Sequence, residues 1–224
     1  MPVYLQPTAP TARDALLPGD PGHALLLAQR LLSSPLMSNH SHGLWGYHGE
    51  TADGRPLTIQ STGIGGPSAA IVLRELSELG VERAVRVGAC TALDPALDPG
   101  SAIVADRALA GDGTSAALGA TGAVAPDPAL TRRLAEAAPD AGVETVVSTD
   151  PFHDRRPDGA PVADLESAAL LALGDAVGVA VAVILVVGPA SEDRIACAGS
   201  AASAALADAG DQDRSPGPGI ESPA

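Results

Sequence analysis

The chain has 224 residues, of which 46% are hydrophobic, 18% charged and only 2% aromatic. This composition predicts a single globular domain with a core of Ala, Val, Leu and Ile, and it excludes a disordered chain. The formal net charge of −14 argues against nucleic acid as a partner, because a polyanion would be repelled.

All thirteen basic residues are arginines. The lack of lysine excludes Schiff-base, Walker-type and kinase-type lysine chemistry. The two cysteines, Cys90 and Cys197, make neither a disulfide framework nor a zinc-binding spacing. The N-terminus lacks a signal-peptide pattern, and the longest apolar stretch, 177–187, is too short to span a bilayer. We therefore expect a cytoplasmic protein with no membrane partner.

Hydrophobic periodicity and turn residues predict strands that alternate with helices in the first half of the chain. Asp20 is the expected N-cap of the first helix, and Pro21 suits its first turn. The expected elements are a strand over 15–17, a helix over 22–32, paired strands over 44–49 and 56–61, and a helix over 68–79.

The alternation continues in the second half. The expected elements are strands over 84–87 and 102–105, a helix over 128–138, a strand over 144–148, a helix over 165–177 and a strand over 179–187. Together they predict an α/β fold around a largely parallel or mixed sheet. We expect one domain over residues 1–209 and a disordered tail over 210–224, which is rich in Pro, Gly, Ser and Asp.

Arg86 ends an apolar strand directly before an expected glycine turn at Gly88. A guanidinium in this position needs an anionic partner, and a phosphate or one of the chain's own carboxylates would serve. Two further glycine turns, at Gly19 and at 63–66, each follow an expected strand and lead into an expected helix. The free N–H groups and the dipole at the start of a helix attract anions. The need for glycine in a tight turn would also explain these residues without any bound anion.

Five segments, in this order, resemble the motifs of the nucleoside phosphorylase family that includes hexameric purine nucleoside phosphorylase and uridine phosphorylase. They are Pro18–Pro21, Gly63–Ser68, Arg86–Cys90, Ser148–Phe152 and Asp164–Ala168. The resemblance implies a single α/β domain whose twisted, partly barrel-like mixed sheet is flanked by helices. It also implies cleavage of a purine or uridine-type nucleoside by inorganic phosphate, as co-substrate, to a free base and a pentose 1-phosphate, with no metal or other cofactor.

The same resemblance implies two groups of site residues. The phosphate-binding group is Gly19, His23, His42, Arg86, Ala89 and Thr91. The nucleoside-binding group is Ile64, Phe152, Asp164, Leu165 and Glu166. Within these groups Glu166 would accept hydrogen bonds from the ribose hydroxyls, Phe152 would stack on the base, and Arg86 and Glu166 would act in catalysis.

The chain departs from the family pattern at both sites. His23 and His42 stand where arginines are usual, so phosphate affinity should depend on pH. His42 takes a place often supplied by a neighbouring subunit, which implies a homo-oligomer, a dimer at least and by similarity a hexamer. The family's Ser-Asp acid is missing after the last strand, so either Glu192 or Asp193 replaces it as proton donor or the acid is lost.

Other hypotheses remain open at this point. A nucleosidase would use water in place of phosphate, and a degenerate family member would bind nucleosides without turnover. His40, His42 and His48 could form a metal cluster, since two of them share one face of an extended segment. For single residues, Phe152 could be core, Glu166 a partner of the helix dipole, and Cys90 a small buried filler.

Overall fold

The structure is a computed structural model, and it describes residues 2–150 and 159–207. The elements, in chain order, are β1 (Asp14–Pro18), α1 (Pro21–Leu31), β2 (Leu32–Asn39), the 3-10 turn η1 (Ser41–Gly43), β3 (Gly46–Thr51), β4 (Pro56–Gln60), α2 (Gly66–Glu78), β5 (Arg83–Ala92), β6 (Ala102–Gly111), α3 (Gly113–Ala117), β7 (Ala123–Val124), α4 (Pro128–Ala137), β8 (Gly142–Thr149), β9 (Val162–Asp164), α5 (Ser167–Val177), β10 (Ala180–Val187) and α6 (Glu192–Ala205). None of the described helices is long and apolar enough to cross a membrane. The predicted tail over 210–224 lies outside the described residues.

The strands form one mixed sheet that curls back on itself. Its order is β10-β6-β8-β9-β5-β1-β4-β3-β2, β7 pairs with β6, and β10 also pairs with β5. The β10–β5 pairing joins the first strand of this order to its fifth, so half of the sheet closes into a partial barrel. The predicted α/β domain with a partly barrel-like mixed sheet is therefore confirmed.

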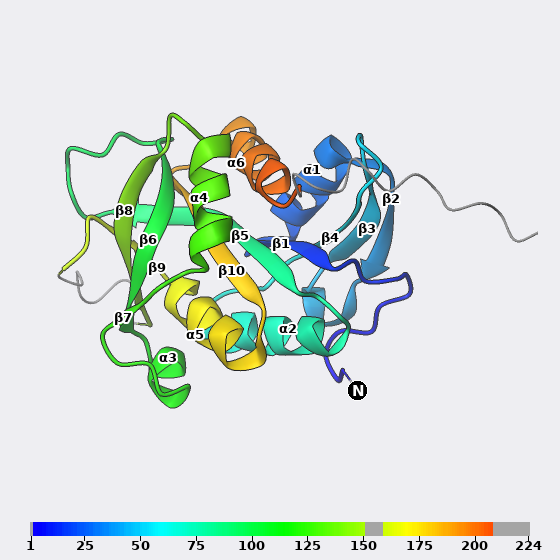
Figure 1. Cartoon of the computed structure of the whole chain (residues 1–224), viewed down its shortest axis with the longest axis horizontal. Coiled ribbons are helices and arrows are strands. Elements are labelled where there is room, and N and C mark those ends of the chain that lie inside the picture. The colour runs from blue at the N-terminus through cyan, green and yellow to red at the C-terminus, as the bar shows by residue number, and fades with distance from the viewer. Residues whose placement is uncertain (1, 151–158, 208–224) are drawn as a thin grey trace, which may run out of the picture.

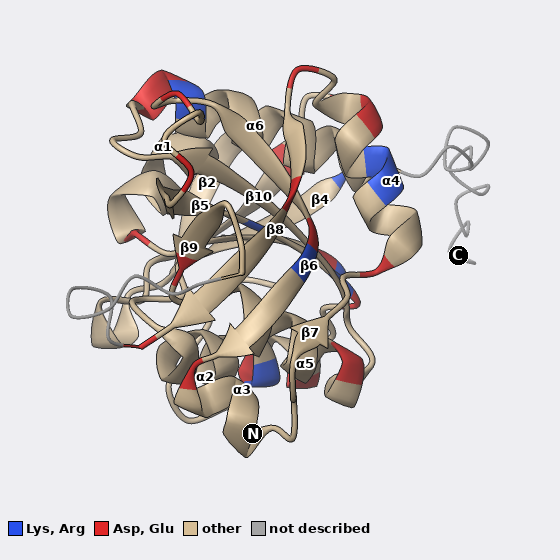
Figure 2. Ribbon diagram, turned by 90° about the vertical axis from the view of Figure 1, so that its left-hand side faces the viewer, with Lys and Arg blue, Asp and Glu red and all other residues tan. Residues whose placement is uncertain are grey.

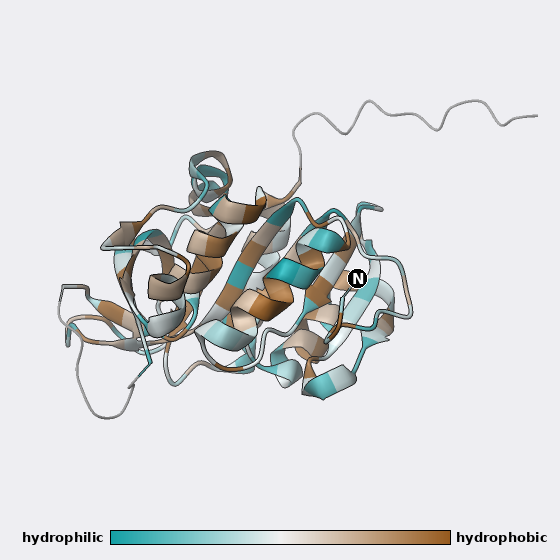
Figure 3. Ribbon diagram, turned by 90° about the horizontal axis from the view of Figure 1, so that it is seen from below, coloured by the Kyte–Doolittle hydropathy of each residue, from teal (hydrophilic) through white to brown (hydrophobic). Residues whose placement is uncertain are grey.

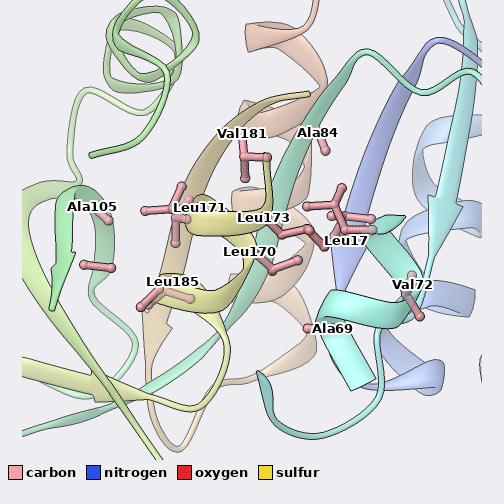
Figure 4. Close-up of a cluster of buried hydrophobic side chains, with 14 of the residues drawn as sticks. Leu17, Ala69, Val72, Ala84, Ala105, Leu170, Leu171, Leu173, Val181 and Leu185 are labelled. Atoms are coloured by element: carbon pink, nitrogen blue, oxygen red, sulfur yellow. The ribbon is translucent and has the colours of Figure 1, made fainter. Parts of the chain in front are cut away.

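Helices cover both faces of the sheet (Figure 1). The helices α1, α4 and α6 pack together on one face, and α2, α3 and α5 on the other. Each group covers its own buried cluster of mainly aliphatic side chains. Figure 4 shows part of the second cluster, where Leu170 and Leu173 of α5 approach Leu17 of β1. The sheet is thus held rigidly between two helical layers.

The helices carry both polar and apolar residues. Seen from the α2 and α5 side, hydrophobic and hydrophilic positions both occur along the helices (Figure 3), as expected for helices with one buried face. Acidic residues are spread over several helices and loops of the face in Figure 2.

Several elements differ from the sequence expectation. The expected turn after Arg86 is wrong, because β5 runs straight through Gly88 to Ala92, paired with β10 and then with β9. The helix expected from Leu165 begins at Ser167. The strands β2, β7 and β9 and the helices α3 and α6 were not expected; β7 and β9 are only two and three residues long, and α6 is rich in Ala, Ser and Gly, without a strong apolar period.

The helix α6 can approach α1 closely because of Gly199. A Cβ atom at Gly199 would lie 2.2 Å from Cδ2 of Leu27, a fully buried side chain of α1. The buried side chain of Leu27 cannot move freely in this close-packed layer. The contact fixes α1 relative to α6, and α1 carries residues of the site described below.

We predict that Gly199→Ala destabilises the protein by about 1–3 kcal/mol through overpacking against Leu27. The matched control is Ser200→Ala on the exposed side of the same helix, which should change the free energy of unfolding by less than about 0.5 kcal/mol. Urea denaturation of both variants measures the difference. Equal stabilities for the two variants would contradict the packing described.

Candidate active site

A large cavity lies where several strands end at one side of the sheet. It has a volume of about 820 Å³ and is lined by the segments that follow β1, β4, β9 and β10, by the end of β5 and by the turn η1. Because β1, β4, β5 and β10 run parallel, their carboxyl ends meet at this edge. Ligands of α/β proteins bind at such edges.

A buried ion cluster forms the floor of this cavity. Arg86 lies between Asp164 and Glu166, and the exposed fractions of the three side chains are 3%, 0% and 8%. Nε of Arg86 donates to Oδ2 of Asp164 at 3.1 Å, and Nη2 donates to Oε2 of Glu166. The sequence left open a carboxylate of the chain as the partner of Arg86, and the structure shows two such partners, Asp164 and Glu166.

The third nitrogen of the guanidinium has no such partner. Nη1 of Arg86 is buried and makes no hydrogen bond to any described residue. It faces the turn after β1, since a Cβ atom at Gly19 would lie 3.9 Å from it. A buried donor without a partner costs about 1–3 kcal/mol, and such atoms are rare unless a ligand or water satisfies them.

The charge of Arg86 is secure in this setting. Burial alone would lower the pKa of the guanidinium, but Glu166 and Asp164 outweigh that effect and raise the pKa above its usual value. The group is therefore a permanent cation, and its unpartnered Nη1 lies near the turn at Gly19. Its two carboxylates leave the cluster with a net charge of −1 when both are ionised.

Asp164 lines the cavity, and its carboxylate is held by several groups of the protein. Its carboxylate accepts hydrogen bonds from Oγ of Ser148 at 2.6 Å, from N and Oγ of Ser167, and from Arg86. Its side chain has no exposed surface. These bonds show that Asp164 holds Arg86 and the start of α5.

Glu166 connects the cluster to the turn before α2. Its Oε1 accepts from the N–H of Gly65 at 2.8 Å, while Oε2 accepts from Arg86. Although Glu166 occupies the N-cap position of α5, its side chain makes no capping bond there. The helix-dipole explanation for this residue is therefore not supported. Its carboxylate lies at the wall of the cavity, where a ligand hydroxyl could reach it.

Most of the other predicted residues also line this cavity. They are Gly19, His23, His42, Ile64, Ala89, Thr91 and Leu165. Ile64 is 84% exposed and offers an apolar surface at the mouth. Asp20 caps α1 as expected and accepts from the N–H groups of Gly22 and His23. His42 lines the cavity of its own chain, so its position does not by itself require a second copy.

Two of the predicted residues that the structure describes are not found at the cavity. Glu192 and Asp193 lie exposed in the first turn of α6, do not line the cavity, and Asp193 forms an ion pair with Arg30 at 3.5 Å. The assignment of either one as proton donor is therefore wrong for this conformation, because the helix directs them to solvent. Phe152 lies outside the described residues.

The proposed histidine metal cluster is not formed. Among residues 2–150 and 159–207, no three His, Cys, Asp or Glu side chains come together in a way that could hold a metal ion. This covers His40, His42 and His48. The position of η1 explains the outcome, because it separates His42 from β3, which carries His48.

Sequence reasoning missed two serines and one glycine of the site. Ser148 and Ser167 hold the carboxylate of Asp164, and each hydroxyl lies 2.6 Å from it. Gly88 is needed because a Cβ atom there would lie 2.9 Å from Nη2 of Arg86. The available signal was Gly88 two residues after Arg86, which places both on one face of a strand.

Cys90 lines the cavity but is a poor nucleophile. Burial, with Asp164 nearby, raises the pKa of its thiol to about 12, although Arg86 acts in the opposite direction. Cys197 is exposed. The reading of Cys90 as a small buried filler agrees with this environment.

We predict that iodoacetamide at pH 8 modifies Cys197 and leaves Cys90 intact in the native protein, because only a thiolate reacts. Intact mass and peptide mapping measure the modification. Cys197→Ser should then show no label, whereas the denatured wild type should take two. Rapid labelling of native Cys90 would contradict the buried, protonated thiol.

The comparisons with known proteins agree on one family. Residues 13–213 match the model of the phosphorylase superfamily. A uridine phosphorylase of Treponema pallidum is 33% identical over 198 residues, which cover 77% of this chain and 76% of that protein. A guanosine phosphorylase of Halorubrum lacusprofundi is 42% identical over 101 residues, or 45% of this chain and 41% of that protein. The match thus spans less than half of the length of the latter relative.

Solved structures agree with the architecture. Uridine phosphorylase from Vibrio fischeri ES114 superposes with a TM-score of 0.78 at 25% identity, over 88% of this chain and 91% of that one. Purine nucleoside phosphorylase from Toxoplasma gondii, solved in complex with immucillin-H, gives a TM-score of 0.80 at 22% identity and supports the fold alone. With its family model matched over most of its length, the chain belongs to the phosphorylase superfamily, together with purine and uridine nucleoside phosphorylases.

Proposed function

We propose that the chain is a nucleoside phosphorylase that cleaves the N-glycosidic bond of a purine or uridine-type nucleoside with inorganic phosphate. The observation that carries this proposal is the unpartnered Nη1 of Arg86, a buried cationic donor at the wall of the cavity. A phosphate oxygen satisfies such a donor well. A nucleosidase, which binds only water beside the sugar, would leave this donor with a weaker partner.

In this mechanism Arg86 and the turn at Gly19 hold the phosphate beside the anomeric carbon. Glu166 accepts hydrogen bonds from the sugar hydroxyls, and Ile64 covers an apolar face of the nucleoside. His23, His42 and Thr91 complete the polar wall near the phosphate. Holding both reactants in line lowers the entropic cost of the reaction, and the fixed charges stabilise the oxocarbenium-like sugar.

Among the described residues, no carboxyl group at the cavity is free of other hydrogen-bond partners and available to protonate the departing base. The carboxylates that line the cavity are Asp20, Asp164 and Glu166, and each already accepts backbone N–H or arginine hydrogen bonds. This favours, as a second candidate, a family member that binds nucleosides and turns them over slowly or not at all. A base that leaves as a stabilised anion would suffer least from the missing acid.

The remaining expectations stay proposals. We propose a homo-oligomer, at least a dimer and by similarity to the family a hexamer, located in the cytoplasm. Neither a metal nor an organic cofactor is part of the proposed chemistry. Nucleic acid and membranes are not expected partners, given the net charge of −14.

The direct test incubates the purified protein with guanosine, inosine and uridine, with and without phosphate, and measures free base by chromatography. We predict base release that requires phosphate and yields pentose 1-phosphate. Phosphate-independent release would establish the nucleosidase. Nucleoside binding by calorimetry without release would establish the non-catalytic family member.

A second prediction tests the role of Arg86 without removing its charge. Gly88→Ala should push Nη2 of Arg86 out of place, because the new Cβ would lie 2.9 Å from it. We expect the KM for phosphate to rise by about tenfold or more, the equivalent of one charge-assisted hydrogen bond.

Gly142→Ala, on β8, is the matched control for this variant, because a Cβ there makes only an ordinary 3.4 Å contact with Ile103 of β6. It should leave the KM for phosphate unchanged. An unaltered phosphate dependence in Gly88→Ala would remove Arg86 from the proposed phosphate site.

A further inference from the structure

An extended arm, residues 3–8, crosses the molecule beside α2 and the end of β2. Its backbone is tied at several points: Thr8 donates to the carbonyl of Ser38 at 2.7 Å, and Gln6 donates to Oδ1 of Asn39 at 2.9 Å. Leu5 is 2% exposed and joins the core beneath α2. None of the functions proposed above uses this arm.

The first part of the arm is held by one carboxylate, that of Glu75 on α2. Its oxygens accept hydrogen bonds from the backbone N–H groups of Val3 at 2.7 Å, Tyr4 at 3.0 Å and Leu5 at 2.6 Å. Glu75 is 7% exposed. Consecutive N–H groups that converge on a buried anion make strong, charge-assisted hydrogen bonds. The backbone at Tyr4 is therefore fixed in place.

The second part of the arm is joined to the turn that carries His42. The amide of Asn39 accepts from Gln6 through Oδ1 and donates through Nδ2 to the carbonyl of Leu44. Asn39 and Leu44 flank the turn η1 on either side. Because both partners are backbone groups of fixed polarity, the orientation of the amide is unambiguous. One side chain thus braces the arm and the turn against each other.

The arm reaches His42 itself through Tyr4. The two rings lie edge to face, with centroids 5.3 Å apart and an interplanar angle of 62°. His42 has a φ of 57°, in the left-handed region that side-chain-bearing residues seldom adopt. It lines the cavity beside Gly43 and Leu44. His42 thus contacts Tyr4 and also belongs to the lining of the cavity.

Tyr4 contributes little to the core, which separates its role from that of Leu5. Tyr4 keeps 41% of its surface exposed, while Leu5 beside it is buried. If the arm only stabilised the fold, the buried Leu5 and the bonds to Glu75 would suffice. The ring of Tyr4 instead packs against a residue of the cavity wall.

We propose that this arm is a positioning element for the site: Glu75 fixes the backbone of Tyr4, and the ring of Tyr4 holds the imidazole of His42 toward the cavity. The inference rests on the proposed function, in which His42 contributes to phosphate binding. Tyr4 and Glu75 are positioning residues, since neither lines the cavity. An ordered His42 would bind phosphate with less loss of side-chain entropy.

The kinetic test uses the full chain and compares Tyr4→Ala with the conservative Tyr4→Phe. Tyr4→Ala should raise the KM for phosphate by roughly two- to tenfold, the range of an aromatic pair, while the KM for the nucleoside stays the same. Tyr4→Phe keeps the ring and should restore the wild-type KM. Val3→Ala, whose side chain is 66% exposed on the same arm, serves as the neutral control.

A double-mutant cycle shows whether Tyr4 acts through His42. His42→Asn removes the ring but tolerates the left-handed backbone. In that background Tyr4→Ala should have no further effect on the KM for phosphate. If the two effects multiply, or if Tyr4→Ala raises the KM of both substrates equally, the positioning role is overturned.

A readout without activity keeps this inference separate from the proposed function. In two-dimensional NMR of the imidazole C–H groups, Tyr4→Ala and Glu75→Gln should shift the His42 signal, assigned from His42→Asn, and leave that of His23 in place. Shifts of His42 without any phosphate-dependent turnover would mean that the arm orders His42 but the proposed function is wrong. An unshifted His42 signal would overturn the inference itself.

Discussion

The buried contact between Arg86 and its two carboxylates is the constraint on which the site depends. A guanidinium that is 3% exposed cannot stay in a protein interior without anionic partners, and Asp164 and Glu166 supply them from β9 and the start of α5. Removing one partner from such a cluster costs several kcal/mol, because the remaining charge is left buried and unpaired. The strand β5, the strand β9 and the helix α5 are thereby fixed relative to one another.

The same cluster joins the proposed phosphate-binding residue to the proposed sugar-binding residue. Glu166, the proposed partner of the sugar hydroxyls, bonds to Arg86, the proposed partner of phosphate, and to the N–H of Gly65 in the turn below Ile64. The hydroxyls of Ser148 and Ser167 hold Asp164 from behind. A site whose reactive groups are oriented by a second layer of hydrogen bonds is preorganised for its ligands.

Much of the fold and the site could be predicted from the sequence, for physical reasons that apply to particular residues. The turns at Gly19 and at Gly63–Gly66 follow apolar strands and precede helices, so parallel pairing brings them to one edge, and both line the cavity. Seven of the predicted residues besides Arg86, Asp164 and Glu166 lie there: Gly19, His23, His42, Ile64, Ala89, Thr91 and Leu165.

The rest depended on tertiary structure that local patterns do not encode. The sequence did not show that Ser148 holds the carboxylate of Asp164, because Ser148 lies 16 positions earlier in the chain and only the pairing of β8 with β9 brings the two together. Glu192 and Asp193 were expected at the base, but the Ala-rich segment after them folds into α6 and directs both to solvent. The arm over residues 3–8 depends on Glu75, about seventy positions away.

The central claim is that the unpartnered Nη1 of Arg86 is the phosphate site, and a crystal structure of the protein soaked with inorganic phosphate tests it most directly. We predict a phosphate in the cavity, with one oxygen within hydrogen-bond distance of Nη1 of Arg86 and another near the backbone of Gly19, while Asp164 and Glu166 keep their contacts with the guanidinium. A cavity that stays empty of phosphate, or a phosphate bound elsewhere with Nη1 still unpartnered, would contradict the account.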